Sequence, residues 1–232
     1  MKYHSNCNVP HRHLTTGNPP TRLLQIGQPI AGKIRLLADL KQIKTGFQYA
    51  TLSHCWGSSN PLQLTSASFH SLQQGITISE LGQTFQDAIF IAQSLEIEFV
   101  WIDSLCILQD SEEDWLREAP LMSNVYKNAR LNIATSVAAD TNAGCFLDRD
   151  PFLIQPCTIQ TTWKDHENDT YDLYYGNFWD ESFLKIPLMK RAWVVQELIL
   201  AQRVLYITNA QFFWECCSLT ACESYQTVYH LT

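Results

Sequence analysis

The sequence lacks the features that would place the protein in a membrane or on nucleic acid. No stretch approaches the roughly 20 consecutive apolar residues that a membrane-spanning helix needs. The first 20 residues contain no apolar segment of the kind found in secretory signals. Lysine and arginine total 16 against 23 aspartate and glutamate residues, the formal net charge is −7, and no basic run occurs. We therefore expect a cytoplasmic protein that binds neither nucleic acid nor membranes.

The sequence also lacks the motifs of common metal and nucleotide sites. It has no Gly-x-Gly-x-x-Gly loop, which argues against an ordinary dinucleotide-binding oxidoreductase. Its eight cysteines include no Cys-x-x-Cys pair, and without a secretory signal we expect reduced thiols. Two groups could form part of a metal site but do not have the paired spacing of a zinc module: Cys7, His11 and His13, and Cys216, Cys217 and Cys222. We expect no metal and no cofactor.

Apolar periodicity predicts an alternation of strands and helices. Strands are predicted within the ranges 21–27, 33–40, 47–57, 98–103, 130–136, 203–207 and 211–217. Helices are predicted at 84–98, at 110–129 with a kink or a fresh start at Pro120, and at 187–202. Gln83 or Thr84 is expected to cap the first helix, with Asp87 in its first turn, and Asp110 or Ser111 to cap the second. Residues 58–80 are expected to form a long loop, and 157–163 with 170–176 a hairpin.

Strands that alternate with helices indicate an α/β fold with a mainly parallel central sheet flanked by helices. The two N-terminal strands and the β-hairpin are predicted additions to this sheet. We expect a single domain over residues 22–217, with an irregular lead-in at 1–21 and a tail at 218–232. A chain of 232 residues is long enough to bury one sizeable core.

Polar and aromatic side chains follow the central strands where these strands end. Ser53, His54, Cys55 and Trp56 come after the first central strand, the segment from Asp103 to Asp110 follows the second, and Ser136 follows the third. Because ligands of open α/β sheets bind at this carboxyl edge, we expect a site there. The structural alternative is that His54 is a packed core residue and that Asp103 caps the following turn. His54 does not readily activate the neighbouring Cys55, since adjacent strand residues point to opposite faces.

The helix predicted at 187–202 carries an unusual pair, Trp193 and Glu197, one helical turn apart on the same face. This helix should stand beside the carboxyl edge of the sheet. Taken without other information, a Glu on such a helix is more often a solvated surface charge, and a Trp more often a core residue.

Three segments resemble, in order and spacing, the signature blocks of the fungal heterokaryon incompatibility (HET) domain family. They are "YATLSHCWG" (49–57), "FVWIDSLCILQDSEEDWLREAPLMSNVYKNARLNIATS" (99–136) and "RAWVVQELILAQRVLYI" (191–207). The flanking "PTRLLQIG", "NAGCFLDRDP" and "FFWEC" also resemble that family, so the similarity covers about residues 20–217. This sequence departs from the pattern at His54, Leu108 and Pro120, where the family commonly has Tyr, Asn and a helix former.

The resemblance implies a role in fungal self/non-self recognition, in which the domain triggers regulated cell death. It further implies a remoter similarity to TIR domains, which have a flavodoxin-like sheet and in many cases cleave NAD⁺ with a glutamate in a Trp-x-x-x-Glu-Leu pattern. The segment "WVVQEL" (193–198) has this pattern, so Glu197 is the implied catalytic residue. Position suggests the following substrate-binding residues: Ser53, His54, Trp56, Gly57, Asp103, Arg191 and Trp193.

Two functions from different classes stay open. The first is a cell-death effector that hydrolyses NAD⁺, as a substrate and not a cofactor, to nicotinamide and ADP-ribose. The second is a non-enzymatic signalling module that acts by self-association or by binding a partner domain. A conservative change of Glu197 separates the two, because an enzyme would lose its activity and keep its fold.

Overall fold

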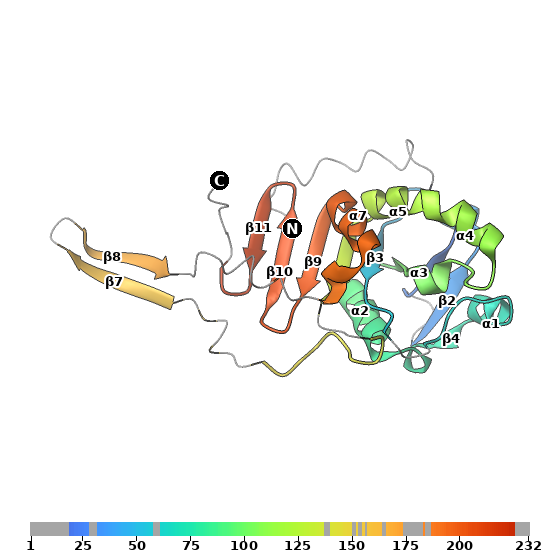
Figure 1. Ribbon diagram of the computed structural model, residues 1–232, viewed down its shortest axis with the longest axis horizontal. Helices are drawn as coiled ribbons and strands as arrows, with labels where there is room; N and C mark the ends of the chain where they lie inside the picture. Colours follow the sequence, from blue (N-terminus) through green and yellow to red (C-terminus); the bar gives the residue numbers. More distant parts are fainter. Residues whose placement is uncertain are drawn as a thin grey trace.

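A mixed nine-stranded β-sheet runs through the body of the protein (Figure 1). The computed structural model describes residues 19–27, 32–57, 61–136, 140–149, 152, 155, 157–163, 166–173, 183 and 187–225. In spatial order, the strands of the sheet are β11 (Leu219–Cys222), β10 (Phe212–Cys216), β9 (Arg203–Ile207), β6 (Leu131–Thr135), β3 (Tyr49–Ser53), β5 (Phe99–Trp101), β1 (Leu23–Gln25), β2 (Lys33–Leu37) and β4 (Ile76–Thr77).

The four central strands β9, β6, β3 and β5 are parallel, and the strands on either side of them pair antiparallel. Ala50 of β3 lies opposite Val100 of β5 on one side and Leu131 of β6 on the other. Every residue of β3, β5 and β6 is buried, and the polar residues Thr51, Ser53, Asn132 and Thr135 of β3 and β6 are hydrogen-bonded to one another across the two strands. The predicted mainly parallel central sheet is confirmed.

Helices cover both faces of these strands. The Tyr49 hydroxyl of β3 donates to the Val125 carbonyl of α5 (Met122–Asn128) at 2.7 Å. Ser53, on the same face of the strand, is hydrogen-bonded to α7 (Ala192–Leu200). The next residue, His54, packs its ring edge-on against Phe85 of α2 (Gln83–Ser94), with centroids 5.0 Å apart. Alternation along β3 therefore places α5 and α7 on one face and α2 on the other.

The second predicted helix is divided as its proline requires. α4 (Glu112–Glu118) is capped by Ser111, whose Oγ accepts from the Asp114 N–H at 3.2 Å. Pro120 lies in a 3₁₀ turn, η3 (Ala119–Leu121), that joins α4 to α5, so the predicted interruption of the helix at Pro120 is confirmed. The helix predicted at 187–202 is also interrupted. Its first part is a 3₁₀ turn, η5 (Pro187–Lys190), and the extended backbone of Arg191 separates this turn from α7.

Two predictions for the segment 58–98 are wrong. Residues 69–80 are not a loop, because α1 (Phe69–Gln74) buries Leu72, β4 pairs with β2, and η2 (Ile78–Glu80) follows. The N-cap of α2 is Gly82. Thr84 instead donates its N–H to the Thr141 carbonyl at 2.9 Å, and Asp87 lies beyond the first turn and accepts from the Cys145 N–H at 2.6 Å. A distant loop at 140–145 therefore takes the place of local capping.

The predicted hairpin consists of β7 (Cys157–Trp163) and β8 (His166–Leu173), and it projects from the end of the body beyond β11 (Figure 1). β8 begins four residues earlier than predicted, and the neighbouring β11 was not predicted at all. Within the described segments, no helix has the length and apolar character needed to cross a membrane.

A buried ion cluster fastens the start of the sheet to α4. The Arg22 guanidinium donates to both carboxylate oxygens of Asp114, at 2.9 and 2.7 Å, and to the Cys106 carbonyl at 3.0 Å. Asp114 also accepts from the Leu108 N–H at 2.8 Å. Burial by itself would raise the pKa of Asp114, but the hydrogen bond from Arg22 lowers it below its ordinary value. This cluster holds the loop between β5 and α4, which forms one wall of the site described next.

Candidate functional site

A pocket of about 180 Å³ opens at the carboxyl edge of the parallel strands. Its wall combines the segment after β3, the short helix α3 (Asp103–Cys106) and the loop after it, α4 with η3 and α5, and the start of α7. The side chains that line it are Trp56, Asp103, Ile107, Gln109, Trp115, Ala119, Met122, Arg191, Trp193 and Glu197. The predicted convergence of α7 with the strand ends is therefore present in the fold.

Glu197 forms the buried end of this pocket. Its side chain is almost fully removed from solvent, and burial raises the pKa of its carboxyl above the ordinary value. The carboxyl accepts hydrogen bonds from Ser53 and Tyr126, which oppose that rise. Its Oε2 atom has no hydrogen-bond partner among the described residues. A buried carboxyl with a free acceptor atom is the kind of group that reacts or binds ligand, because leaving it without a partner destabilises the fold.

A polar network beneath the pocket holds Glu197 in place. Asn132 of β6 donates from Nδ2 to the Ser53 hydroxyl at 3.1 Å, and its Oδ1 accepts from the Thr51 hydroxyl at 3.1 Å. Tyr126 of α5 is fully buried against Trp101 and donates its hydroxyl hydrogen bond to the Glu197 carboxyl. The network thus joins two strands and two helices under one carboxylate, which fixes the position of its oxygens.

Asp103 organises the polar side of the pocket. Its Oδ2 accepts from the indole N–H of Trp56 at 3.0 Å and lies 3.8 Å from the Arg191 guanidinium. Its Oδ1 accepts from the N–H of the next residue, Ser104, at 2.7 Å, but the N-cap of α3 is Ile102 and no side chain caps this helix. Arg191 also donates to the His54 carbonyl. Of the two interpretations of Asp103 in the sequence, the cap is therefore wrong, and the residue lines the pocket.

Three of the predicted site residues do not line the pocket. Ser53 lies beneath Glu197 and supports it. His54 is buried on the α2 side, and burial lowers the pKa of its imidazole despite Asp103 4.0 Å away. Gly57 is exposed and adopts a positive φ of 66°, which only glycine takes easily. The other five, Trp56, Asp103, Arg191, Trp193 and Glu197, are brought together as predicted.

Sequence reasoning missed one side of the pocket and the network beneath Glu197. Trp115, Ala119 and Met122 line one side, and their i, i+4, i+7 spacing across α4 and η3 was a readable signal. Tyr126 and Asn132 under Glu197 had no such signal, since their roles depend on how β3 and β6 are aligned.

Within the described residues, no group of three or more His, Cys, Asp or Glu side chains has the arrangement of a metal site. Cys216, Cys217 and Cys222 form no disulfide with another described cysteine. Cys7, His11 and His13 lie outside the described residues.

Fold and pocket together define an α/β protein with a candidate ligand site at the carboxyl edge of a parallel sheet, closed at its inner end by a buried glutamate. The family model for heterokaryon incompatibility protein (HET) matches residues 49–197, from the first residue of β3 to that glutamate. The chain therefore belongs to the heterokaryon incompatibility family, as its three sequence blocks predicted. No curated protein and no solved structure matches it significantly.

Proposed function

We propose that the pocket binds NAD⁺ and that Glu197 supports hydrolysis of its nicotinamide–ribose bond. The observation that carries this proposal is the buried Glu197 carboxyl, which lines the pocket, has a raised pKa and has an oxygen without a partner among the described residues. The order of the parallel strands is a second support. Taken along the chain, they lie in the order second, first, third, fourth, which is the flavodoxin-like order expected of a TIR-like domain.

The chemistry requires little proton transfer to the leaving group. When the bond between C1′ of the ribose and the pyridinium nitrogen breaks, its electron pair goes to nitrogen, and nicotinamide leaves as a neutral molecule. Positive charge develops on the ribose, and the ionised Glu197 carboxylate stabilises it, as carboxylates do in glycoside hydrolysis. A water oxygen then bonds to C1′ and releases its proton to Glu197 or to solvent. The products are nicotinamide, ADP-ribose and one proton.

The remaining pocket residues would hold the substrate. Trp56, fixed through its indole N–H by Asp103, offers an aromatic surface beside Glu197. Arg191 supplies a cation for the diphosphate, with Asp103 orienting its guanidinium. In this proposal the protein is a cytoplasmic cell-death effector of fungal self/non-self recognition, and depletion of NAD⁺ is its output.

The test is analysis of the products formed from NAD⁺ by purified protein. The protein concentration is high, because an enzyme that is active only when self-associated would be inactive in dilute solution. We expect nicotinamide and ADP-ribose in equal amounts. Glu197→Gln should lower the rate by at least about 100-fold, the usual effect of removing one electrostatic stabiliser. Glu113→Gln, which makes the same charge change on the exposed side of α4, should retain activity. Equal rates in both variants would contradict a role for Glu197.

A second function, assembly without catalysis, is favoured by one specific observation. Cys157 lies opposite Leu173 in the hairpin, and Ile159 opposite Tyr171, so these four exposed side chains share one face. A two-stranded sheet with an uncovered apolar face suits a docking role, in self-association or with a partner domain. Ile159→Lys should then lower association measured by sedimentation. Thr158→Lys, on the opposite face, should not.

A further inference from the structure

The pocket has a graded depth, and the type of side chain changes along it. Glu197, only 3 % exposed, closes the inner end. The Arg191 side chain, 29 % exposed, lies at an intermediate level. Trp115 and Trp193, 47 % and 52 % exposed, lie at the mouth. From inside outward, the pocket therefore offers a carboxylate, a cation and a pair of aromatic rings.

The two mouth tryptophans come from different elements that are held rigidly together. Trp115 is on α4 and Trp193 is in the first turn of α7. α5 continues from α4 through η3 and packs against α7, while the Arg22–Asp114 pair anchors α4 to the sheet. Exposed aromatic rings on two fixed helices, at the mouth of one pocket, form a preorganised surface for a flat ring.

The size of the pocket places part of the ligand outside it. Its volume of about 180 Å³ is below the roughly 300–1,000 Å³ of pockets that enclose drug-sized ligands. A dinucleotide whose reacting ribose lies at Glu197 would therefore extend past Arg191 and across the mouth. Its anionic diphosphate would meet the guanidinium, and its second base would reach the level of Trp115 and Trp193.

We propose that Trp115 and Trp193 bind the adenine base of the substrate and so make the enzyme selective for a dinucleotide over a mononucleotide. This inference rests on the proposed NAD⁺ hydrolysis and adds a specificity site to it. Stacking on aromatic rings suits adenine, because every base has a π-face and an exposed Trp offers a large rigid one. Trp115 has no other evident role, since its ring is half exposed and outside the core cluster.

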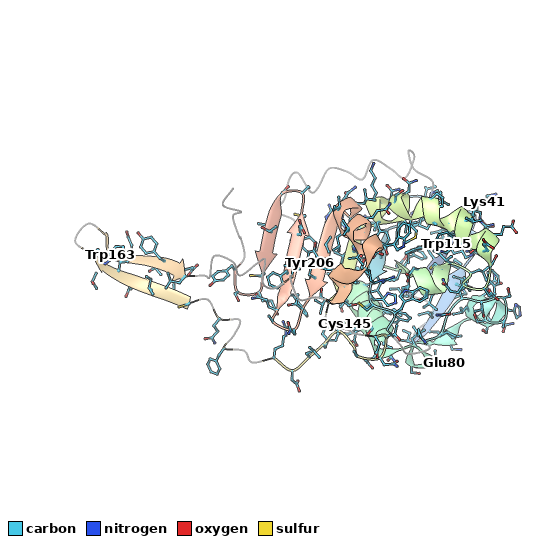
Figure 2. The ribbon with its side chains drawn as sticks, viewed as in Figure 1. Lys41, Glu80, Trp115, Cys145, Trp163 and Tyr206 are labelled. Carbon is cyan, nitrogen blue, oxygen red and sulfur yellow. The ribbon has the colours of Figure 1, made fainter. Side chains whose placement is uncertain are left out.

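The experiment compares two substrates that share the cleaved bond. NAD⁺ and nicotinamide mononucleotide both carry the nicotinamide ribose and its phosphate, but only NAD⁺ carries the adenosine part. We expect Trp115→Ala and Trp193→Ala each to lower kcat/KM for NAD⁺ about tenfold, through KM, and to leave the mononucleotide unchanged. Trp115→Phe should recover most of the loss. Trp163→Ala is the matched control, because Trp163 is 67 % exposed and lies on the hairpin at the opposite end of the molecule from Trp115 (Figure 2).

A binding measurement separates failure of this inference from failure of the proposed reaction. Isothermal titration calorimetry with AMP should show binding to the wild-type protein and about tenfold weaker binding to Trp115→Ala. If neither the wild-type protein nor any variant releases nicotinamide, but AMP binding depends on Trp115, the proposed hydrolysis is wrong and the adenine-binding site is supported. If the tryptophan variants lower kcat/KM equally for NAD⁺ and for the mononucleotide, the adenine-binding site is overturned. It is also overturned if AMP binds to all the proteins with equal affinity or to none of them.

Discussion

Replacing Tyr126 by Phe tests whether the network under the pocket controls the charge of Glu197. Tyr126 is buried on α5, packs edge-on against Trp101 with centroids 5.7 Å apart, and hydrogen-bonds the Glu197 carboxyl. Phe keeps the ring and its packing and removes the hydroxyl. The ionised carboxylate then has Ser53 as its remaining donor in the network.

The size of the effect follows from the strength of that bond. A hydrogen bond to a charged group stabilises it by about 1.5–3 kcal/mol. Its loss shifts the equilibrium between ionised and protonated Glu197 by about 10- to 150-fold toward the protonated form. Burial already raises the pKa of this group, so the substitution raises it further. Because hydrolysis needs the carboxylate, the rate falls as the pH drops through this pKa, and the acid limb of the variant moves to higher pH.

The assay is kcat for nicotinamide release from about pH 5 to about pH 9. The variant should be slower by about 10- to 150-fold on the acid side and equal to wild type well above both limbs. Tyr49→Phe is the matched control. It removes another buried hydroxyl, which donates to the Val125 carbonyl at 2.7 Å, and should leave the pH profile unchanged. A defect of the same size at every pH would refute this explanation.

Three further substitutions have clear expected outcomes. Burial raises the pKa of Glu197 above 4.5, so the ionised form opposes folding. Glu197→Gln should therefore raise the thermal midpoint at pH 8, and calorimetry should find this gain gone below about pH 4.5, where both states are protonated. Arg22→Met leaves the buried carboxylates of Asp114 and Glu118 with Arg117 as a cation and removes the hydrogen bonds from Arg22, so it should cost about 1.5–3 kcal/mol in urea unfolding. A change below about 1 kcal/mol would mean that the cluster is not tightly buried. Gly82→Ala places a Cβ 2.5 Å from the Thr141 carbonyl oxygen and should lower the free energy of unfolding by about 1–3 kcal/mol. An unchanged urea midpoint would show that the loop at 140–145 moves freely.

The central sheet could be predicted because its signals are local. Strands buried on both faces are rich in apolar residues, and all of β5 and three of the five residues in each of β3 and β6 are apolar. Pro120 predicted a break, because a proline lacks the N–H that a continuous helix needs. The spacing of Trp193 and Glu197 placed both on the helix that lines the pocket.

What could not be predicted depends on contacts between distant segments. Gly82 begins α2 because the loop at 140–145 supplies the hydrogen bonds that a capping side chain would otherwise supply. The roles of Asn132 and Tyr126 follow from the alignment of β3 with β6 and from the packing of α5 against α7. The inner position of Glu197 follows from the same contacts. A local sequence pattern cannot distinguish a Glu that faces solvent from one that is buried at the inner end of a pocket lined by tryptophans.

In the function we propose, this HET-family protein hydrolyses NAD⁺ in its pocket through Glu197. Its most direct test is the initial rate of nicotinamide release from NAD⁺ by the wild-type protein and by Glu197→Gln, each shown by circular dichroism to be folded. We expect release by the wild type and a rate at least about 100-fold lower in the variant. Release by neither protein, or by both at the same rate, would contradict it.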